Sequence, residues 1–223
     1  MFLSRIIWRP TGTPPSEFWK LLQTDYGAHK LLWSLFADSP ERTRDFLYRQ
    51  EGEGDKARFF VLSEREPVDK LGLWEVGTKH FAPEFTTGER LIFSLRANPT
   101  VKRGVEGHKN SVRHDVIMDE KRRAQASGEV DIDEPALVQR AGLAWLAGKG
   151  PSRGFALDTG RVRVDGYRQW RFRKTGGHEV RFSSVEYDGV LTVTDPALFT
   201  AMLQAGIGPS RAFGCGLMMV KRA

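Results

Sequence analysis

The sequence contains one cysteine, Cys215, among its 223 residues. One thiol cannot form an intrachain disulfide, and it excludes a cysteine-rich zinc site. Long apolar runs are also missing, because no segment approaches the roughly 20 residues that a membrane-spanning helix needs. Residues 1–8 form a short apolar run without the small residues of a cleavage site, which is typical of a β-strand rather than a signal peptide. We therefore expect a cytoplasmic protein with no membrane partner.

The charge is moderately positive, with 34 lysines and arginines against 28 acidic residues, a formal net charge of +6. Such a surplus permits a polyanionic partner, because each phosphate that a basic side chain neutralises releases condensed counterions. It does not establish one, since many basic proteins bind nothing acidic. Hydrophobic residues make up 40% of the chain, which is enough to bury a core.

The order of predicted elements favours an α+β fold with two tandem ferredoxin-like (RRM-like) domains, at residues 1–85 and 86–223. In the first domain, apolar alternation and turn residues predict strands at 2–8, 45–50, 58–62 and 74–81, and helices at 17–23, 26–36 and 67–73. In the second, they predict strands at 90–97, 155–164, 167–174, 179–193 and 213–220, and helices at 136–146 and 196–204. The charged segment 98–130 between them is predicted to be mobile.

The predicted helix 26–36 carries a candidate proton-transfer site. Its apolar residues gather on one side, whereas Tyr26, His29, Lys30 and Trp33 gather on the other. Tyr26 and His29 lie in the first turn, where free backbone N–H groups and the helix dipole favour an anion such as phosphate. The alternative is an inert surface histidine, which is the commoner case for such spacing alone.

The sequence offers no convincing metal site. The acidic cluster at 129–134 precedes a helix, so capping and dipole stabilisation explain it better than two-metal chemistry. His108 and His114 lack helical pair spacing and a nearby cysteine, and His80 and His178 are typical of ordinary strand or turn residues. The remaining chemistry uses a histidine to move a proton, and a cation or phenol to stabilise charge on phosphate.

Two further segments are unusual. Residues 206–217 hold four glycines and a proline between a predicted helix and strand, which allows close backbone approach; a simple capped connection explains only part of this glycine content. Residues 161–174 are predicted to form a basic hairpin that turns at Asp165-Gly166, with Arg161 and Arg163 on one face. A basic hairpin with aromatics behind it suits an RNA phosphate track, and a solvated arginine face is the alternative.

Taken together, these segments resemble the CasE family of type I-E CRISPR systems over nearly the whole chain. The resemblance is carried by residues 1–5 (MFLSR), 26–36 (YGAHKLLWSLF), 44–48 (RDFLY), 93–99 (FSLRANP), 144–146 (AWL), 182–195 with YDGVL, and the glycine segment 206–217. The long segment 102–134 departs from the family pattern.

The resemblance implies an endoribonuclease that needs no metal and no cofactor. It would cut CRISPR precursor RNA at the base of each repeat stem-loop by 2′-hydroxyl attack, retain the product, and join the other subunits of Cascade. Tyr26 and His29 match the family's catalytic pair. The expected RNA-binding residues are Lys30, Arg96, Lys102, Arg113, Arg161, Arg163, Arg168, Arg171, Arg173, Gly206, Gly208, Gly214 and Gly216. The alternative is a non-catalytic subunit that binds an RNA hairpin within a ribonucleoprotein.

Overall fold

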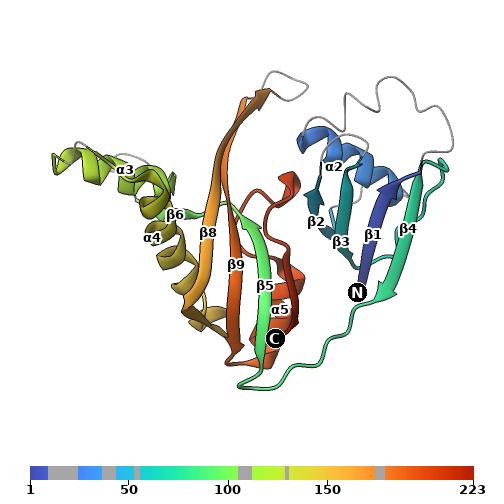
Figure 1. Ribbon diagram of the computed structural model, residues 1–223. Helices are drawn as coiled ribbons and strands as arrows, with labels where there is room; N and C mark the ends of the chain where they lie inside the picture. The colour runs from blue at the N-terminus through green and yellow to red at the C-terminus, as the bar shows by residue number, and fades with distance from the viewer. Residues whose placement is uncertain (10–24, 37–43, 53–55, 105–111, 129–130, 174–178) are drawn as a thin grey trace.

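The chain folds around two four-stranded antiparallel sheets (Figure 1). The structure is a computed structural model, and it describes residues 1–9, 25–36, 44–52, 56–104, 112–128, 131–173 and 179–223. The predicted helix 17–23, His108 and His178 lie outside these ranges. None of the helices in the described ranges is long and apolar enough to cross a membrane.

The N-terminal sheet has the strand order β2-β3-β1-β4. Helix α2 (Asp25–Trp33) and the 3-10 turn η1 (Ser34–Phe36) bury Ala28, Leu32, Leu35 and Phe36 in the same core as Phe59 and Trp74 of the sheet. The apolar stripe predicted for this helix is therefore confirmed. The strands are β1 (Phe2–Trp8), β2 (Phe46–Glu51), β3 (Arg58–Ser63) and β4 (Trp74–His80).

The predicted helix 67–73 is wrong, because this segment has no helical turn. The Asp69 carboxylate accepts hydrogen bonds from the backbone N–H groups of Leu71 (3.0 Å) and Trp74 (2.7 Å). A short acidic side chain that bonds its own backbone in this way offers an alternative to helical hydrogen bonding. The segment is therefore a loop that leads directly into β4.

The C-terminal sheet has the order β10-β5-β9-β8. Counted along each half, both sheets follow the ferredoxin-like order 4-1-3-2, which confirms the predicted fold class. All strands of one sheet precede residue 85 and all strands of the other follow it, which supports our proposed domain boundary there. The remaining elements are β5 (Arg90–Ala97), α4 (Glu134–Ala147), η3 (Pro151–Arg153), β8 (Phe155–Arg173), β9 (Glu179–Val193), α5 (Pro196–Ala205), η4 (Arg211–Phe213) and β10 (Met218–Arg222).

The predicted hairpin at Asp165-Gly166 is also wrong. Residues 155–173 form one long strand that pairs with β9 along its length, and its register shifts at Leu157/Val162 and again at Asp165/Arg168. Gly166, at φ 62°, lies in the second irregularity. The Asp-Gly pair therefore supplies a β-bulge instead of a reversal, a role that glycine's access to positive φ equally permits.

Part of the segment predicted to be mobile is ordered. It contains β6 (Thr100–Arg103), β7 (Val112–Asp115) and α3 (Val116–Ala126), whereas residues 105–111 and 129–130 lie outside the described ranges. Strands β6 and β7 pair with each other as a separate two-stranded sheet. The side chain of Asp115 caps α3, a start signal that the low hydrophobicity of this segment obscured.

Strand β2 joins the two halves. The Tyr48 hydroxyl donates to the carbonyl oxygen of Ala212 (3.1 Å), and Arg49 donates to the Ser94 hydroxyl (2.8 Å) and pairs with Glu186 (3.4 Å). An apolar cluster that includes Leu47 of β2 also crosses between them. In Figure 1 the red segment after α5 lies between the two sheets, next to β2 and α2. The halves therefore share a packed interface at which a site can form.

Candidate active site and nucleic-acid interface

His29 lies on α2, half-buried against aromatic side chains of the N-terminal domain. Its ring centroid is 5.9 Å from that of Trp33, 5.9 Å from that of Phe46 and 6.4 Å from that of Tyr48. Phe46 and Tyr48 are buried residues of β2, so the imidazole rests against a rigid support. His29 was expected on the face away from the apolar stripe, whereas its half-buried ring contacts two aromatic residues of the core that the stripe helps to form.

The glycine-rich segment after α5 brings the C-terminal domain up to this helix. Gly206 (φ 74°) and Gly216 (φ 94°) both have left-handed backbones, and a Cβ on Gly216 would lie 3.0 Å from the carbonyl oxygen of Ile207. The Ile207 N–H donates to the Gly216 carbonyl (3.0 Å), and the Gly216 N–H donates to the Arg96 carbonyl (2.8 Å). The predicted close approach of backbones is therefore confirmed, and it places η4 against α2 and β2.

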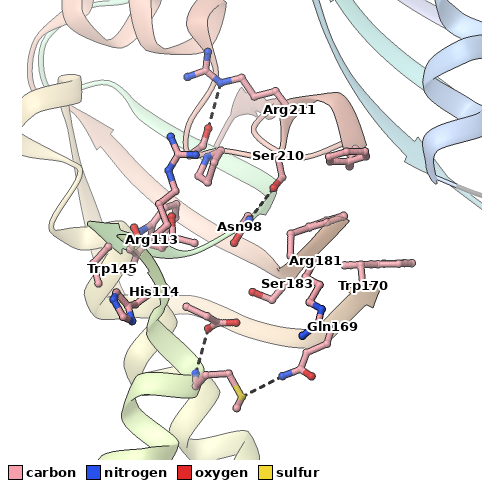
Figure 2. Close-up of a pocket in the computed structure, with 18 of the residues that line it drawn as sticks. Asn98, Arg113, His114, Trp145, Gln169, Trp170, Arg181, Ser183, Ser210 and Arg211 are labelled. Carbon is pink, nitrogen blue, oxygen red and sulfur yellow. Dashed lines mark hydrogen bonds between the residues drawn. The ribbon is translucent and has the colours of Figure 1, made fainter. Parts of the chain in front are cut away.

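A cavity of about 1810 Å³ opens between the domains, with His29 and Arg44 in its wall. Figure 2 shows lining residues from the C-terminal domain. The C-terminal domain contributes most of the rest, including the aromatic side chains of Trp145, Trp170 and Phe182. The basic residues of the lining are Arg44, Lys102, Arg113, Arg122, Lys149, Arg153, Arg171, Arg181 and Arg211, whereas its acidic residues are Asp115 and Asp119. This excess of positive charge over an aromatic surface suits a nucleic acid.

Two arginines of the cavity are partly desolvated. Burial lowers the pKa of the Arg44 guanidinium; Tyr48 opposes that shift and the charge of Arg211 adds to it. Burial likewise lowers the pKa of Arg211, with a further contribution from Arg153. Arg211 is held by the carbonyl oxygens of Gly208 (3.2 Å) and Gly206 (3.3 Å). Partly buried cations that repel each other are stabilised by a bound anion, so this end of the cavity is suited to phosphate.

The structure brings together only part of the predicted RNA-binding set. Lys102, Arg113 and Arg171 line the cavity together with Gly208 of the glycine-rich segment. Gly206, Gly214 and Gly216 shape that segment without lining the cavity. Lys30 is exposed on α2 outside the lining. The side chains of Tyr26 and Arg173 lie outside the described residues.

Three predicted arginines lie elsewhere on the C-terminal sheet. Arg161 pairs with Asp158 (3.7 Å), and Arg163 pairs with Asp165 (3.2 Å) and Asp188 (3.4 Å). Arg168 lies with its guanidinium carbon 5.9 Å from the ring centroid of Trp170. None of these three lines the cavity. Because β8 continues as a strand past the bulge at the Asp-Gly pair, Arg161 and Arg163 lie in its middle and not at its end.

Arg96 has a structural role that the sequence prediction missed. It pairs with Glu186 and donates to the carbonyl oxygen of Gln50 (3.3 Å) in the other domain. This side chain connects the domains instead of lining the cavity.

Several cavity residues escaped sequence reasoning, namely Arg44, Arg122, Arg153, Arg181 and Arg211. Arg44 and Arg211 lie in segments that carry the family resemblance, and the resemblance could have identified them as candidates. Arg122 belongs to a helix that was not predicted. Arg181 lies in the cavity lining next to Arg171, with which it is paired across β8 and β9. Among the described residues, no group of three or more His, Cys, Asp and Glu side chains could hold a metal ion.

Comparison with known proteins agrees with this geometry. A family model described as CRISPR associated protein matches residues 1–222. The chain is 30% identical over 196 residues to the CRISPR system Cascade subunit CasE of Escherichia coli (strain K12), with 86% of this chain and 89% of that protein covered. The chain belongs to the CasE family of CRISPR-associated proteins.

Two further members extend the comparison. The CRISPR-associated endoribonuclease Cse3 of Thermus thermophilus is 30% identical over 151 residues, covering 64% of this chain and 60% of that one. A solved structure of the CRISPR endoribonuclease Cse3 bound to a 19-nucleotide RNA superposes with a TM-score of 0.73 at 25% identity, covering 99% of this chain and 100% of that one. The tandem ferredoxin-like fold is thus that of the CasE family.

Proposed function

We propose that the chain is an endoribonuclease that cuts CRISPR precursor RNA at the base of the repeat stem-loop and stays bound to the product as a Cascade subunit. The observation that carries this proposal is His29, fixed against buried aromatics at the wall of an arginine-rich cavity. The relatives support it, since one is named a Cascade subunit and another is an endoribonuclease whose structure contains RNA. The resemblance adds Tyr26 as the partner of His29.

The proposed reaction uses the RNA's own nucleophile. The 2′-hydroxyl upstream of the cut attacks the adjacent phosphorus in line, the P–O5′ bond breaks, and the products are a 2′,3′-cyclic phosphate and a 5′-hydroxyl. The 2′-hydroxyl loses a proton and the 5′ oxygen gains one. His29 carries out one of these two transfers, a contribution typically worth roughly 10²–10⁴ in rate, and solvent water carries out the other. Arg44 and Arg211 would stabilise the negative charge that develops on the phosphate. Apart from the RNA's own 2′-hydroxyl and solvent water, these steps rely on side chains of the protein, and we propose that they proceed without a metal.

A cleavage assay separates this function from the alternatives. The purified chain is incubated with a repeat hairpin RNA from its own genome in excess EDTA, and the product ends are identified. We expect one cut at the base of the stem, with a 2′,3′-cyclic phosphate and a 5′-hydroxyl. Tight binding without a cut, in EDTA or in magnesium, would indicate a non-catalytic hairpin-binding subunit. A cut that requires added magnesium or manganese would indicate a metal-dependent nuclease.

A further inference from the structure

The β6–β7–α3 unit, residues 100–103 and 112–126, stands outside the ferredoxin-like pattern and forms one wall of the cavity. It contributes three cations to the lining: Lys102, Arg113 and Arg122. Lys102 and Arg113 are directly opposite each other on β6 and β7. Like charges in that position destabilise a strand pair. An anion bound between them would remove this cost.

The carboxylates of the unit do not neutralise these cations. Asp119 pairs with Arg103 (2.8 Å), which lies outside the cavity lining. Asp115 uses both oxygens elsewhere: Oδ1 caps α3, and Oδ2 accepts from the Tyr167 hydroxyl (2.9 Å). Within the described ranges, the structure gives Lys102, Arg113 and Arg122 no carboxylate partner. This wall therefore presents three available positive charges to the cavity.

The facing wall is the end of the β8–β9 pair, where Arg171 and Arg181 lie directly opposite each other. Both donate to Glu179, and these hydrogen bonds lower the pKa of that carboxyl group. One carboxylate shared by two guanidinium groups leaves a net positive charge on this side as well. The cavity thus has basic surfaces on two separate elements, whose spacing decides whether one RNA can contact both.

A small hydrogen-bond network links the two walls, in addition to the apolar packing of Ile117 against the core of the domain. The hydroxyl of Tyr167, at the bulge of β8, donates a hydrogen bond to the carboxylate of Asp115, which also caps α3. The Gln169 side-chain amide donates to the Tyr167 hydroxyl (3.0 Å) and to Sδ of Met118 on α3 (3.1 Å), as Figure 2 shows for the latter. Burial raises the pKa of Tyr167, so its phenol stays protonated and remains a donor throughout the neutral range.

We propose that Tyr167 is a positioning residue for RNA: through Asp115 it holds the β6–β7–α3 unit at a fixed distance from the β8–β9 end, so that Lys102, Arg113 and Arg122 bind phosphates of the hairpin that also contacts Arg171. The identity of the ligand as a repeat hairpin rests on the proposed function. The hydrogen bonds that link the two walls are observed independently of that function.

Tyr167→Phe tests the proposal, because it keeps the ring and deletes the hydroxyl that joins the walls. With a repeat hairpin RNA as the probe, we expect affinity to fall by about ten-fold and log Kd to depend less steeply on log salt, since fewer phosphates are neutralised together. The single-turnover rate at saturating protein should stay within about two-fold of wild type, because Tyr167 belongs to the C-terminal domain and does not line the cavity beside His29. A loss of rate at saturation without a loss of affinity would overturn the proposal.

Tyr187→Phe is the matched control. Tyr187 is fully buried in the same domain, and among the described residues its hydroxyl has no hydrogen-bond partner. We expect its affinity and salt dependence to match wild type. Equal weakening by both substitutions would reduce the Tyr167 effect to general destabilisation of the domain and would contradict a positioning role.

A double-mutant cycle with Arg122→Ala separates positioning from a local structural effect. If Tyr167 acts by holding the wall that carries Arg122, the two losses of affinity should be less than additive. Fully additive losses would contradict the proposal. The cycle measures binding alone, so its outcome does not depend on the cleavage assay. A chain that binds the hairpin but does not cut it would refute the proposed function, and the cycle would still test the role of Tyr167.

Discussion

The imidazole of His29 stacks beside the phenol ring of Tyr48, with 6.4 Å between the ring centroids and 24° between the ring planes. The Tyr48 hydroxyl in turn donates to the Ala212 carbonyl in the other domain (3.1 Å). The proposed catalytic histidine is therefore supported by a residue that crosses the domain interface. Tyr48 therefore contributes to the relative position of His29 and the glycine-rich segment, together with the direct contacts of η4 with α2 and β2.

Tyr48→Phe should weaken that connection while keeping the aromatic support. A net hydrogen bond contributes about 1 kcal/mol to stability, so we expect a loss of that order in the free energy of unfolding. The cleavage rate at saturating RNA should fall a few-fold, because Ala212 and its neighbour Arg211 are then held less firmly beside His29. Denaturant unfolding and single-turnover cleavage measure the two effects. An unchanged stability would show that the hydroxyl does not join the domains.

His29→Ala should separate catalysis from binding. Removing the proton carrier should lower the cleavage rate by at least about 100-fold, whereas hairpin affinity should stay near wild type because the basic lining is intact. His80→Ala is the control, since His80 is an exposed residue at the end of β4, and its rate should be unaffected. Parallel loss of rate and affinity in His29→Ala would assign this residue to binding or structure.

Arg171→Ala and Arg163→Ala form a matched pair on one strand. Arg171 lines the cavity, whereas Arg163 lies outside it and is engaged by two carboxylates. We expect Arg171→Ala to reduce the slope of log Kd against log salt by up to about one and to weaken different stems similarly, because phosphates carry no sequence information. Arg163→Ala should change neither. If Arg163→Ala weakened binding and Arg171→Ala did not, the RNA-binding surface would lie at the middle of the sheet.

Gly216→Ala should destabilise the glycine-rich segment more than a positive φ alone explains. A Cβ there meets the Ile207 carbonyl oxygen at 3.0 Å, whereas a Cβ on Gly88 (φ 86°) meets nothing within 4 Å. Gly88→Ala should therefore cost about 1–2 kcal/mol from the left-handed backbone, and Gly216→Ala should cost more. Equal losses of unfolding free energy in the two variants would show that the close approach of backbones is not needed.

Regular patterns in the sequence predicted most of the fold. Apolar alternation and turn residues predicted β1, β5 and β9 with their observed bounds, because each strand depends on local apolar periodicity. The errors arose at short polar sequences that are compatible with two different local structures. Asp165-Gly166 serves as a bulge when a long partner strand is present, and Asp69 stabilises a loop where helix was predicted.

The site was harder to predict than the fold. His29 could be placed from helical spacing and family resemblance, because its position depends on one helix. The cavity depends on which side chains meet across two domains, and neither Arg44 beside Arg211 nor Asp115 beside Tyr167 can be read from periodicity. Long-range pairing also joins Arg96 to Glu186 and Arg163 to Asp188, contacts that sequence periodicity does not indicate.

The central claim is that the RNA supplies the nucleophile and His29 moves the proton without a metal. The most direct test compares two hairpins in excess EDTA under single-turnover conditions: one of ribose throughout, and one with a single 2′-deoxy nucleotide just upstream of the cut. We predict that the chain binds both with equal affinity, cuts the first and leaves the second intact. Cleavage of the deoxy hairpin would contradict the account, because water or a protein side chain would then be the nucleophile.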